Sequence, residues 1–516
     1  MKKIVIVGAG AAGYFAAGAI KRNLPHVDVT MVYDPNIPNI GVGESLGWHV
    51  PDFMKNIMGL DDEESWIKES NSTYKFGVVL SGFDGTDTPF MLGGGYPESG
   101  YGPLETLLAK SGYNLFDLWT HLKAKGRVIA PFNQYAAETY WYIYSNTMPK
   151  RYSTDRLLPS NHNYSYHVNA TTIGDVIKRR VCEPVGVVEK AIKVRDVVLN
   201  SQGAIDHLLL DDESKEYADL FIDCTGFARI LVNKLKDFVF EPSDEYRNDS
   251  AIVGPHKFQD YSECRSYTIS KAMDWGWHFS VPSCYRSGEG YIFNSRLVND
   301  VDLLVDEYRK KINKTDVQFR RMSWQPGYYN KIFSGNCVLL GLSAGFIDPF
   351  DSSGLNNTLH QIRTLVESLM QDHTLQLSWG NNLNQRYTQR TSEILIRIQG
   401  FLELATKNDT AYWQHLKVAA QDHDILNTLT NLITLPERNA NSSNYVDIRG
   451  VAFGREALAH NTNYYNIPVD FGATKINVVA EELGMKFLNS NMARNRDLAA
   501  TSISCADYYR QLFPNL

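Results

Sequence analysis

The sequence predicts an α/β fold, and three observations along its 516 residues carry that prediction. A glycine-rich turn lies between two apolar runs at the start of the chain. Two later segments, 217–227 and 336–345, each read as an apolar strand that ends in a turn of small residues. From about residue 356 onward the apolar positions follow the spacing of helices, for example in 359–369 and 394–405.

The first of these observations predicts a β-α-β unit. Residues 3–8 form an apolar strand, 11–22 an Ala-rich helix, and 27–33 a second strand that ends at Asp34. The turn between them reads Gly8-Ala9-Gly10-Ala11-Ala12-Gly13, which allows a tight turn, a close phosphate approach and close packing of helix on strand. A pyrophosphate would meet backbone NH groups at the helix start, and Asp34 is suitably placed for ribose hydroxyls.

The other two observations predict how the chain is divided. A nucleotide domain built from three separated segments is typical of FAD-dependent monooxygenase-type folds and unusual among NAD dehydrogenases. We therefore expect an FAD-binding Rossmann-like fold (GR2, flavin monooxygenase type) with a sheet-bearing, Tyr- and Phe-rich substrate lobe and a mostly helical C-terminal lobe. The expected bounds are 1–74, 216–235 and 330–360 for the FAD-binding domain, 75–215 and 236–329 for the substrate lobe, and 361–516 for the helical lobe.

Composition excludes several classes of function. The net charge of −7 argues against a nucleic-acid groove, and no apolar run of about 18 residues predicts a membrane span. The six cysteines lie far apart without Cys-x-x-Cys spacing, which favours reduced thiols in a cytoplasmic enzyme. His162 and His167 are the nearest histidine pair, and no third ligand accompanies them, so no metal site is expected.

Three motifs outside the glycine turn indicate the chemistry. The segment Trp277-x-Phe279-x-Val281-Pro282 follows another tryptophan at 275, and Lys75 follows the loop Gly41-Val42-Gly43-Glu44-Ser45. Asp351-Ser352-Ser353-Gly354 stands just before the helical region. Together with the glycine turn, these motifs resemble the tryptophan halogenase family of flavin-dependent halogenases, whose signature is Trp-x-Trp-x-Ile-Pro. Two of the four signature positions are substituted here.

The resemblance implies roles for these residues. Reduced FAD, O2 and a halide form hypohalous acid, which Lys75 guides to an aromatic substrate. Asp351 takes the position of a glutamate that orients this acid or accepts the aromatic proton. The halide binds at Ser353 and Gly354, and the side chains that line the passage between flavin and substrate are Trp277, Phe279 and Pro282. The residue types alone also allow purely structural roles: Lys75 as a surface lysine, Asp351 as a helix cap, and Trp277 and Phe279 as aromatic residues of the core.

The resemblance also implies how the cofactor is bound and reduced. FAD contacts are assigned to the glycine turn and to Tyr33, Asp34, Asn36, Asn39, Gly41, Glu44, Leu342 and Leu355. Family members usually carry Glu where Tyr33 stands, so the ribose contact is expected at Asp34. Gly341-Leu342 replaces the Gly-Asp pair of hydroxylases that reduce their own flavin, which implies that a separate flavin reductase delivers reduced FAD.

The substrate is the point where the resemblance weakens. Tryptophan-specific members close a C-terminal Trp over the indole, whereas this chain has Tyr464-Tyr465 in a similar setting and no Trp after Trp413. We therefore expect another small electron-rich aromatic, with chloride, bromide and iodide all left open and a homo-oligomer also left open. The alternatives are an FAD-dependent aromatic hydroxylase that oxidises NAD(P)H itself, and a non-enzymatic protein that escorts others.

Overall fold

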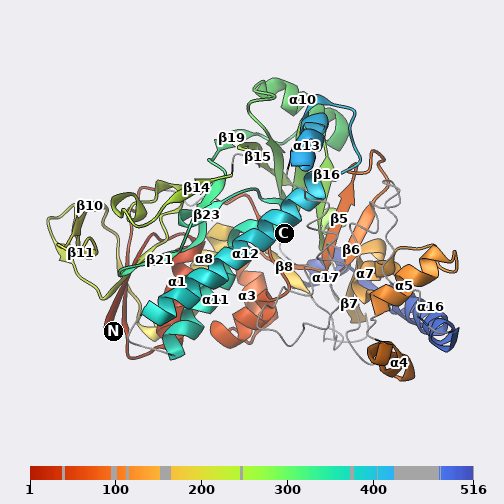
Figure 1. The fold of residues 1–516 in the computed structure, drawn as a ribbon, viewed down its shortest axis with the longest axis horizontal. Helices are drawn as coiled ribbons and strands as arrows, with labels where there is room; N and C mark the ends of the chain where they lie inside the picture. Colours follow the sequence, from red (N-terminus) through yellow and green to blue (C-terminus); the bar gives the residue numbers. More distant parts are fainter. Residues whose placement is uncertain are drawn as a thin grey trace. The chain divides into compact units, whose positions relative to one another are not determined.

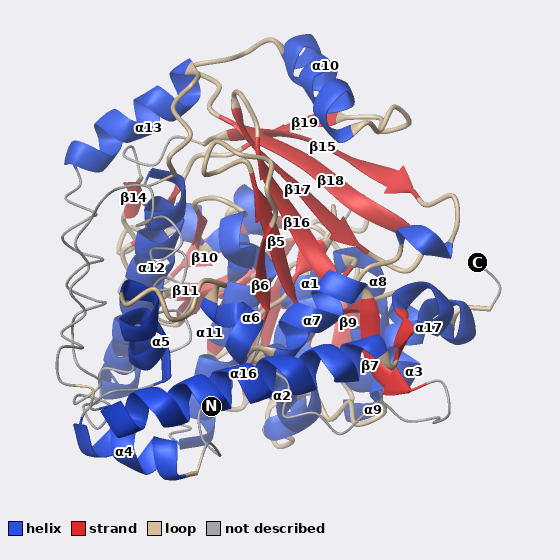
Figure 2. Cartoon of the chain, turned by 90° about the vertical axis from the view of Figure 1, so that its right-hand side faces the viewer, coloured by secondary structure: helices blue, strands red, loops and turns tan. Residues whose placement is uncertain are grey.

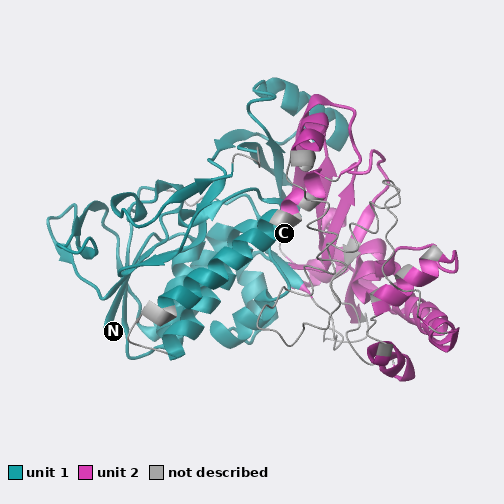
Figure 3. Cartoon of the chain, in the orientation of Figure 1, with its two compact units in different colours: residues 1–73, 165–257, 281–395 teal, residues 74–164, 258–280, 396–516 magenta. Residues whose placement is uncertain are grey.

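A computed structural model describes residues 1–37, 41–93, 102–111, 115–151, 164–243, 248–371, 377–403, 405–422, 476 and 478–514. Contacts between Cα atoms divide the chain into two compact units (Figure 3). Unit 1 comprises 1–73, 165–257 and 281–395, and unit 2 comprises 74–164, 258–280 and 396–516. Each unit is described by itself, and the division into three functional lobes stays a prediction.

Unit 1 is built around a mostly parallel sheet in the order β21-β22-β13-β1-β2-β9. Its strands are β1 (Lys3–Val7), β2 (Asp28–Val32), β9 (Val188–Lys190), β13 (Leu220–Asp223), β21 (Phe333–Ser334) and β22 (Cys337–Leu339). β1 pairs in parallel with β2 and with β13, and β13 pairs in parallel with β22. The expected β-α-β unit and the two later returns to the same sheet are therefore confirmed.

Helices cover this sheet, and the loops after its strands carry the predicted cofactor residues. α1 (Ala11–Asn23) packs against α8 (Ala170–Ile177) and α11 (Ser353–Gln371) (Figure 1). α1 is almost wholly apolar, with eight consecutive buried residues from Gly13 to Ile20, which explains why it lies in the interior. The short helical turn η6 (Gly341–Ser343) follows β22 and lies against α11.

The remaining strands of unit 1 pair with one another in antiparallel fashion. The paired strands are β3 (Glu44–Ser45) with β8 (Ser165–Val168), β10 (Val194–Leu199) with β11 (Ile205–Leu210) and β12 (Lys215–Glu216), β14 (Phe240–Pro242) with β20 (Gly327–Tyr329) and β23 (Gly345–Phe346), and β15 (Ser250–Lys257) with β18 (Arg286–Phe293) and β19 (Arg320–Ser323). The remaining helical segments are α2 (Val50–Asp52), η1 (Phe53–Ile57), α3 (Glu63–Ser70), η2 (Lys178–Cys182), α9 (Glu183–Val185), η3 (Gly226–Ala228), η4 (Val232–Lys234), α10 (Val301–Ile312) and η7 (Phe350–Ser352).

Unit 2 combines a sheet with a helical layer (Figure 2). Its sheet strands are β5 (Gly77–Ser81), β6 (Phe90–Gly93), β16 (Tyr267–Ala272) and β17 (Gly276–Pro282), whose last two residues belong to unit 1. Its other segments are α4 (Pro103–Ser111), α5 (Leu115–Ala124), α6 (Phe132–Ala136), α7 (Glu138–Ser145), β7 (Thr147–Arg151), η5 (Tyr261–Glu263), α13 (Ala411–Asp422), α16 (Val478–Ala500), β24 (Ser502–Ser504) and α17 (Cys505–Leu512). α16 packs against α4, α5 and α6 around an apolar cluster that includes Leu118, Trp119 and Leu488.

Three segments begin in one unit and end in the other. β4 (Thr73–Lys75) starts in unit 1, α12 (Leu377–Glu403) passes into unit 2 after Leu395, and β17 passes into unit 1 after Ser280. All six cysteines are buried and none forms a disulfide. No helix among the described residues is long and apolar enough to cross a membrane, and no group of three or more His, Cys, Asp or Glu side chains there could hold a metal ion.

Candidate functional site

The glycine turn has the geometry that a pyrophosphate needs. Gly8 has a φ of 110°, and a Cβ there would lie 2.4 Å from the carbonyl oxygen of Cys224. A Cβ on Gly13 would lie 2.0 Å from the oxygen of Gly8, so only glycine permits this turn. Gly10 caps α1 without a side-chain hydrogen bond, and the first turn, which includes Ala11 and Ala12, has no acidic residue. The helix start therefore presents backbone NH groups to an anion, which fits FAD.

The end of β2 holds the residues expected near the ribose. Asp34 accepts hydrogen bonds from the backbone NH of Asn36 at 2.9 Å and from its Nδ2 at 3.0 Å, so the two residues form a local turn. The Tyr33 hydroxyl donates to Glu189 Oε2 at 3.1 Å, and burial, aided by Glu189, raises the pKa of Tyr33. Asn39 lies outside the described residues.

A buried carboxylate that sequence reasoning missed organises the loops beside the glycine turn. Asp223, at the end of β13, accepts hydrogen bonds from the Ser343 hydroxyl at 3.0 Å and from the NH groups of Leu231 and Val232 at 2.9 and 3.1 Å. The oxygen that accepts from Ser343, Oδ1, also accepts from the NH of Thr225 at 3.0 Å, whereas Leu231 and Val232 donate to Oδ2. Asp223 thereby connects β13 to η6, which contains Leu342. An Asp followed by small residues at the end of an apolar strand was the available signal.

The loop that contains Gly41 and Gly43 is held between β18 and α11. A Cβ on Gly288 of β18 would lie 1.8 Å from the carbonyl oxygen of Val42, so the loop touches the β18 backbone directly. Gly43 has a φ of 122° and lies against Val281, and the side-chain oxygen of Asn169 lies near Gly41. Further along, the backbone NH of Gly47 donates to Asn356 Oδ1 at 2.9 Å, which ties the loop to α11.

The start of α11 forms the predicted halide position. Ser352 has a φ of 58° and is followed by Ser353 at φ −70° and ψ −16°. Such alternation of handedness turns successive backbone NH groups toward one side, where an anion can bind. The Ser353 hydroxyl donates its hydrogen bond to the carbonyl oxygen of Asp348. The groups at this helix start that can bind an anion are therefore the backbone amides of Ser353 and Gly354. Asp351 lies in η7, but its side chain is outside the described parts, so its role stays a prediction.

Glu44 reaches the same helix start. Its carboxyl group accepts a hydrogen bond from the backbone NH of Leu355, and a Cβ on Gly354 would lie 3.5 Å from its Oε2 atom. Protein atoms around the carboxyl group disfavour its charged form, and this burial raises the pKa of Glu44 to about 7, against the lowering effect of the Leu355 hydrogen bond. Glu44 as a whole residue is half-buried, while its carboxyl group is surrounded by protein atoms.

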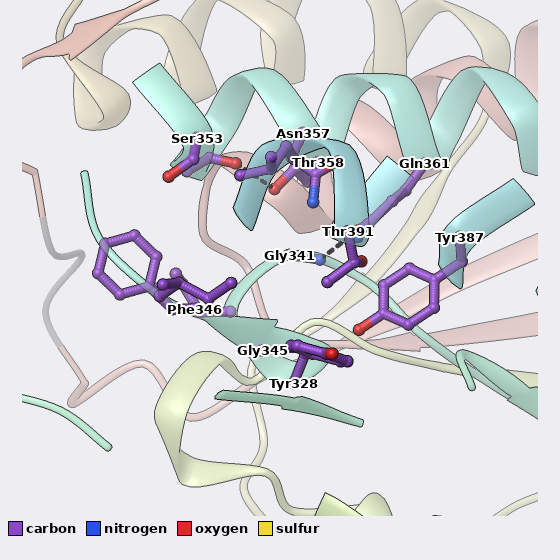
Figure 4. A pocket seen from close by; sticks show the side chains of 14 residues that line it. Tyr328, Gly341, Gly345, Phe346, Ser353, Asn357, Thr358, Gln361, Tyr387 and Thr391 are labelled. Atoms are coloured by element: carbon purple, nitrogen blue, oxygen red, sulfur yellow. Dashed lines mark hydrogen bonds between the residues drawn. The ribbon is translucent and has the colours of Figure 1, made fainter. Parts of the chain in front are cut away.

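A small pocket adjoins the halide position (Figure 4). It has about 30 Å³ of space for water-sized molecules and is lined from η6, α11 and α12, with Leu342, Ser353 and Gly354 among its residues. Gln361 Oε1 accepts from the NH of Gly341 at 3.0 Å, and the Tyr387 hydroxyl donates to the oxygen of Ala344 at 2.9 Å. These two polar residues were not anticipated. Such a volume suits water or a single small ion.

The remaining predicted residues lie in unit 2, apart from Pro282. Lys75 is only 4% exposed, so it is not an ordinary surface lysine. Its neighbours Tyr74 and Phe76 have nearly parallel rings whose centroids lie 6.4 Å apart. Trp277 and Phe279, both buried on β17, have ring centroids 5.9 Å apart. Pro282 belongs to unit 1, where its carbonyl oxygen accepts from the Thr73 hydroxyl at 3.2 Å.

Known proteins resemble the chain along most of its length. The family model described as tryptophan halogenase matches residues 3–467. The tryptophan 7-halogenase RebH of Lentzea aerocolonigenes is 27% identical over 422 residues, which cover 80% of this chain and 78% of RebH. The solved tryptophan 6-halogenase SttH of Streptomyces toxytricini superposes with a TM-score of 0.85 at 22% identity, covering 99% of this chain and 100% of SttH. A tryptophan halogenase structure from Shewanella frigidimarina has a TM-score of 0.84 at 20% identity, and the match covers 100% of this chain and 98% of the Shewanella chain.

Proposed function

The chain belongs to the tryptophan halogenase family of flavin-dependent halogenases, and from this premise we propose that it halogenates a small electron-rich aromatic compound. The observation that carries the proposal is Lys75, a lysine buried at the position that the family motif predicts. Burying an ammonium group is costly, so a lysine at 4% exposure is expected to serve a purpose other than solubility.

The FAD-binding residues support the cofactor assignment. The pyrophosphate would bind at Gly8–Gly13 and the start of α1, and Asp34 would bind the ribose. When reduced, bound FAD supplies, with O2, the oxidising power that turns halide into hypohalous acid. Leu342 stands where self-reducing hydroxylases carry Asp, so we propose that a separate flavin reductase provides the reduced FAD.

The protein's own residues would confine the oxidant and direct it. The backbone amides of Ser353 and Gly354 would bind the halide at the start of α11. The Lys75 ammonium would donate a hydrogen bond to hypohalous acid. Alternatively, after losing a proton, the Lys75 amine would take the halogen as a haloamine and release water; either way the oxidant would not diffuse freely. Asp351 would orient the acid or accept the proton that the aromatic ring loses. Trp277 and Phe279 would contribute bulk that keeps the passage dry.

The substrate is proposed to differ from free tryptophan. RebH and SttH carry names of enzymes that act on tryptophan, but this chain shares only 27% identity with RebH and has Phe279 and Val281 at substituted signature positions. Phe279 keeps aromatic bulk without the indole NH, and Val281 is one methylene smaller than Ile. A phenol or an indole derivative fits a site rich in aromatic side chains.

The test combines the protein with a flavin reductase, FAD, NADH, each halide in turn and a panel of phenols and indoles. Mass spectrometry is expected to show halogenated product with the wild-type protein and at most traces with Lys75→Ala. Lys271→Ala is the control, because Lys271 is a second lysine of unit 2 that is paired with Asp87. FAD binding by both variants checks that they are folded. Undiminished product from Lys75→Ala would refute the role of this lysine.

The same protein preparation distinguishes the halogenase from the alternative function, an FAD-dependent aromatic hydroxylase. The protein is mixed with FAD, NADPH and the aromatic panel under air, without a reductase. The Gly341-Leu342 sequence leads us to expect no NADPH oxidation above the rate of the flavin alone. Rapid NADPH oxidation together with a hydroxylated product would establish the hydroxylase instead.

A further inference from the structure

The carboxyl group of Glu44, which lies at the start of α11, has no part in the roles proposed above. The carboxyl group of Glu44 accepts from the NH of Leu355, and its Oε2 lies over Gly354. β3, which carries Glu44, packs directly against α11 and pairs with β8 through Glu44 and Val168. An acidic side chain is thus built into the helix start to which the halide is assigned.

Two anions cannot share this position without a large cost. The NH groups of the first turn of α11 have no acceptors within the helix, so they attract either a carboxylate or a halide. When Glu44 is ionised, it already satisfies Leu355 and repels a second negative charge at Ser353 and Gly354. When Glu44 is protonated, the repulsion disappears and its OH group can donate a hydrogen bond.

Several titratable groups lie on the segments around Glu44. The titratable residues on the segments packed against β3 are Tyr166 and His167 on β8, Asp348 and Asp351 just before α11, and His360, Arg363 and Glu367 further along that helix. His167 Nδ1 lies 3.2 Å from the Thr73 hydroxyl, and Asp348 accepts from the NH of Phe350 at 2.7 Å and from Asn248 Nδ2 at 3.0 Å. The last two bonds engage Asp348 with donors outside the first turn of α11, whereas Glu44 accepts from Leu355 at the helix start itself.

We propose that the halide enters this site together with one proton, which is carried by the Glu44 carboxyl group. The proposal rests on the halogenase function proposed above and assigns to Glu44 a role in halide binding in place of the flavin contact expected from the family resemblance. It makes the enzyme's affinity for halide depend on pH, because the site is neutral before the halide arrives only when Glu44 is protonated.

The sign and size of the effect follow from the raised pKa of Glu44, about 7. Below this pH Glu44 is protonated and halide affinity is constant. Above it, each pH unit is expected to weaken binding about tenfold, so the dissociation constant at pH 8.5 should exceed that at pH 6 about 30-fold. Glu44→Gln keeps a neutral side chain of the same size, so its affinity should be the same at both pH values.

The experiment measures binding without turnover. Chloride is titrated into the FAD-bound oxidised protein in chloride-free buffers, and binding is followed by the broadening of the chlorine-35 NMR line at pH 6 and pH 8.5. Wild type, Glu44→Gln and Glu241→Gln are compared; Glu241 is an exposed residue of β14 and should leave the wild-type pH dependence unchanged. In wild type alone, a pH electrode should register the uptake of nearly one proton per chloride bound at pH 8.5, a readout that needs no variant to fold.

Equal chloride affinity at the two pH values in wild type, or a pH dependence that persists in Glu44→Gln, would overturn the role of Glu44 and leave the proposed function standing. Failure of chloride to bind at either pH, together with the absence of halogenated product from the aromatic panel, would overturn the proposed function and this inference with it. Proton uptake with chloride that is lost in Glu44→Gln would establish the inference.

Discussion

Replacement of Gly288 by alanine is expected to disrupt the cofactor site through a single methyl group. The new Cβ would lie 1.8 Å from the carbonyl oxygen of Val42, 2.7 Å from its carbon and 3.3 Å from the nitrogen of Gly43. The atoms that it meets belong to the backbone, so no side chain can rotate away. Restoring ordinary contact requires the two segments to separate by roughly 1.5 Å.

The loop is the part that must move. Gly288 lies in β18, where it is opposite Pro255 in an eight-residue antiparallel pairing with β15 that holds it in place. Displacement of Val42 and Gly43 also displaces Glu44. We therefore expect Gly288→Ala to lower the free energy of unfolding by about 1–3 kcal/mol, as other overpacked sites do. FAD affinity should fall at least about tenfold, which corresponds to about 1.4 kcal/mol.

Gly174→Ala is the matched control. It is the same substitution in the same unit, but its Cβ would make only ordinary contacts, at 3.6 Å to Tyr14 and 3.9 Å to Ala11. Gly174 lies inside α8, where alanine is favoured over glycine by about 1 kcal/mol, so this variant should be as stable as wild type or more stable. Urea unfolding and FAD titration by fluorescence measure both variants. A Gly288→Ala protein with wild-type stability and FAD affinity would refute the reasoning.

Three further predictions concern stability and reactivity. Asp223→Ala should lower the free energy of unfolding by about 3–5 kcal/mol, because it leaves several buried donors without an acceptor; urea unfolding would measure this loss, and a loss below about 1 kcal/mol would contradict it. The hydrogen bond from Lys125, followed by that from His121, lowers the pKa of Glu481 from 4.5 to about 2. The stabilisation by Glu481 is therefore complete above pH 4.5 and is lost as the pH falls toward 2. In urea unfolding, Glu481→Gln should be less stable than wild type at pH 6, and the difference in the free energy of unfolding should shrink at lower pH. All six thiols are buried, so a disulfide reagent at pH 8 should react with none of them quickly in the native protein and with six after unfolding, and fast native labelling would count against the packing.

Local sequence patterns were sufficient to predict the β-α-β unit at the start of the chain. The order of an apolar strand, a glycine turn and an Ala-rich helix requires short-range information alone, and the structure forms β1, α1 and β2 within one residue of the expected bounds. The segments at 217–227 and 336–345 were likewise recognisable as strands followed by turns, because each is apolar and ends in small residues. Their place beside β1 followed from the resemblance to a known family.

Long-range contacts decided what each site residue does. Gly47 and Asn356 form a hydrogen bond across 309 positions, and Glu44 reaches Leu355 across a similar separation. No periodicity in the sequence links such residues. The sequence therefore predicted Glu44 to lie near the cofactor, but it could not predict that Glu44 lies at the start of α11. Asp223 also has one distant partner, Ser343 of η6, which is 120 positions away and could not be inferred from local spacing.

The sequence by itself determined the family, and it predicted the cofactor class and the role of Lys75, because motifs depend on residue types at fixed short spacings. Only the tertiary structure decided that Lys75 is buried, that Gly288 must lack a side chain, and that Glu44 shares a helix start with the proposed halide position. The physical reason is that burial, steric exclusion and desolvation are properties of the surroundings, which the chain creates only when distant segments pack together.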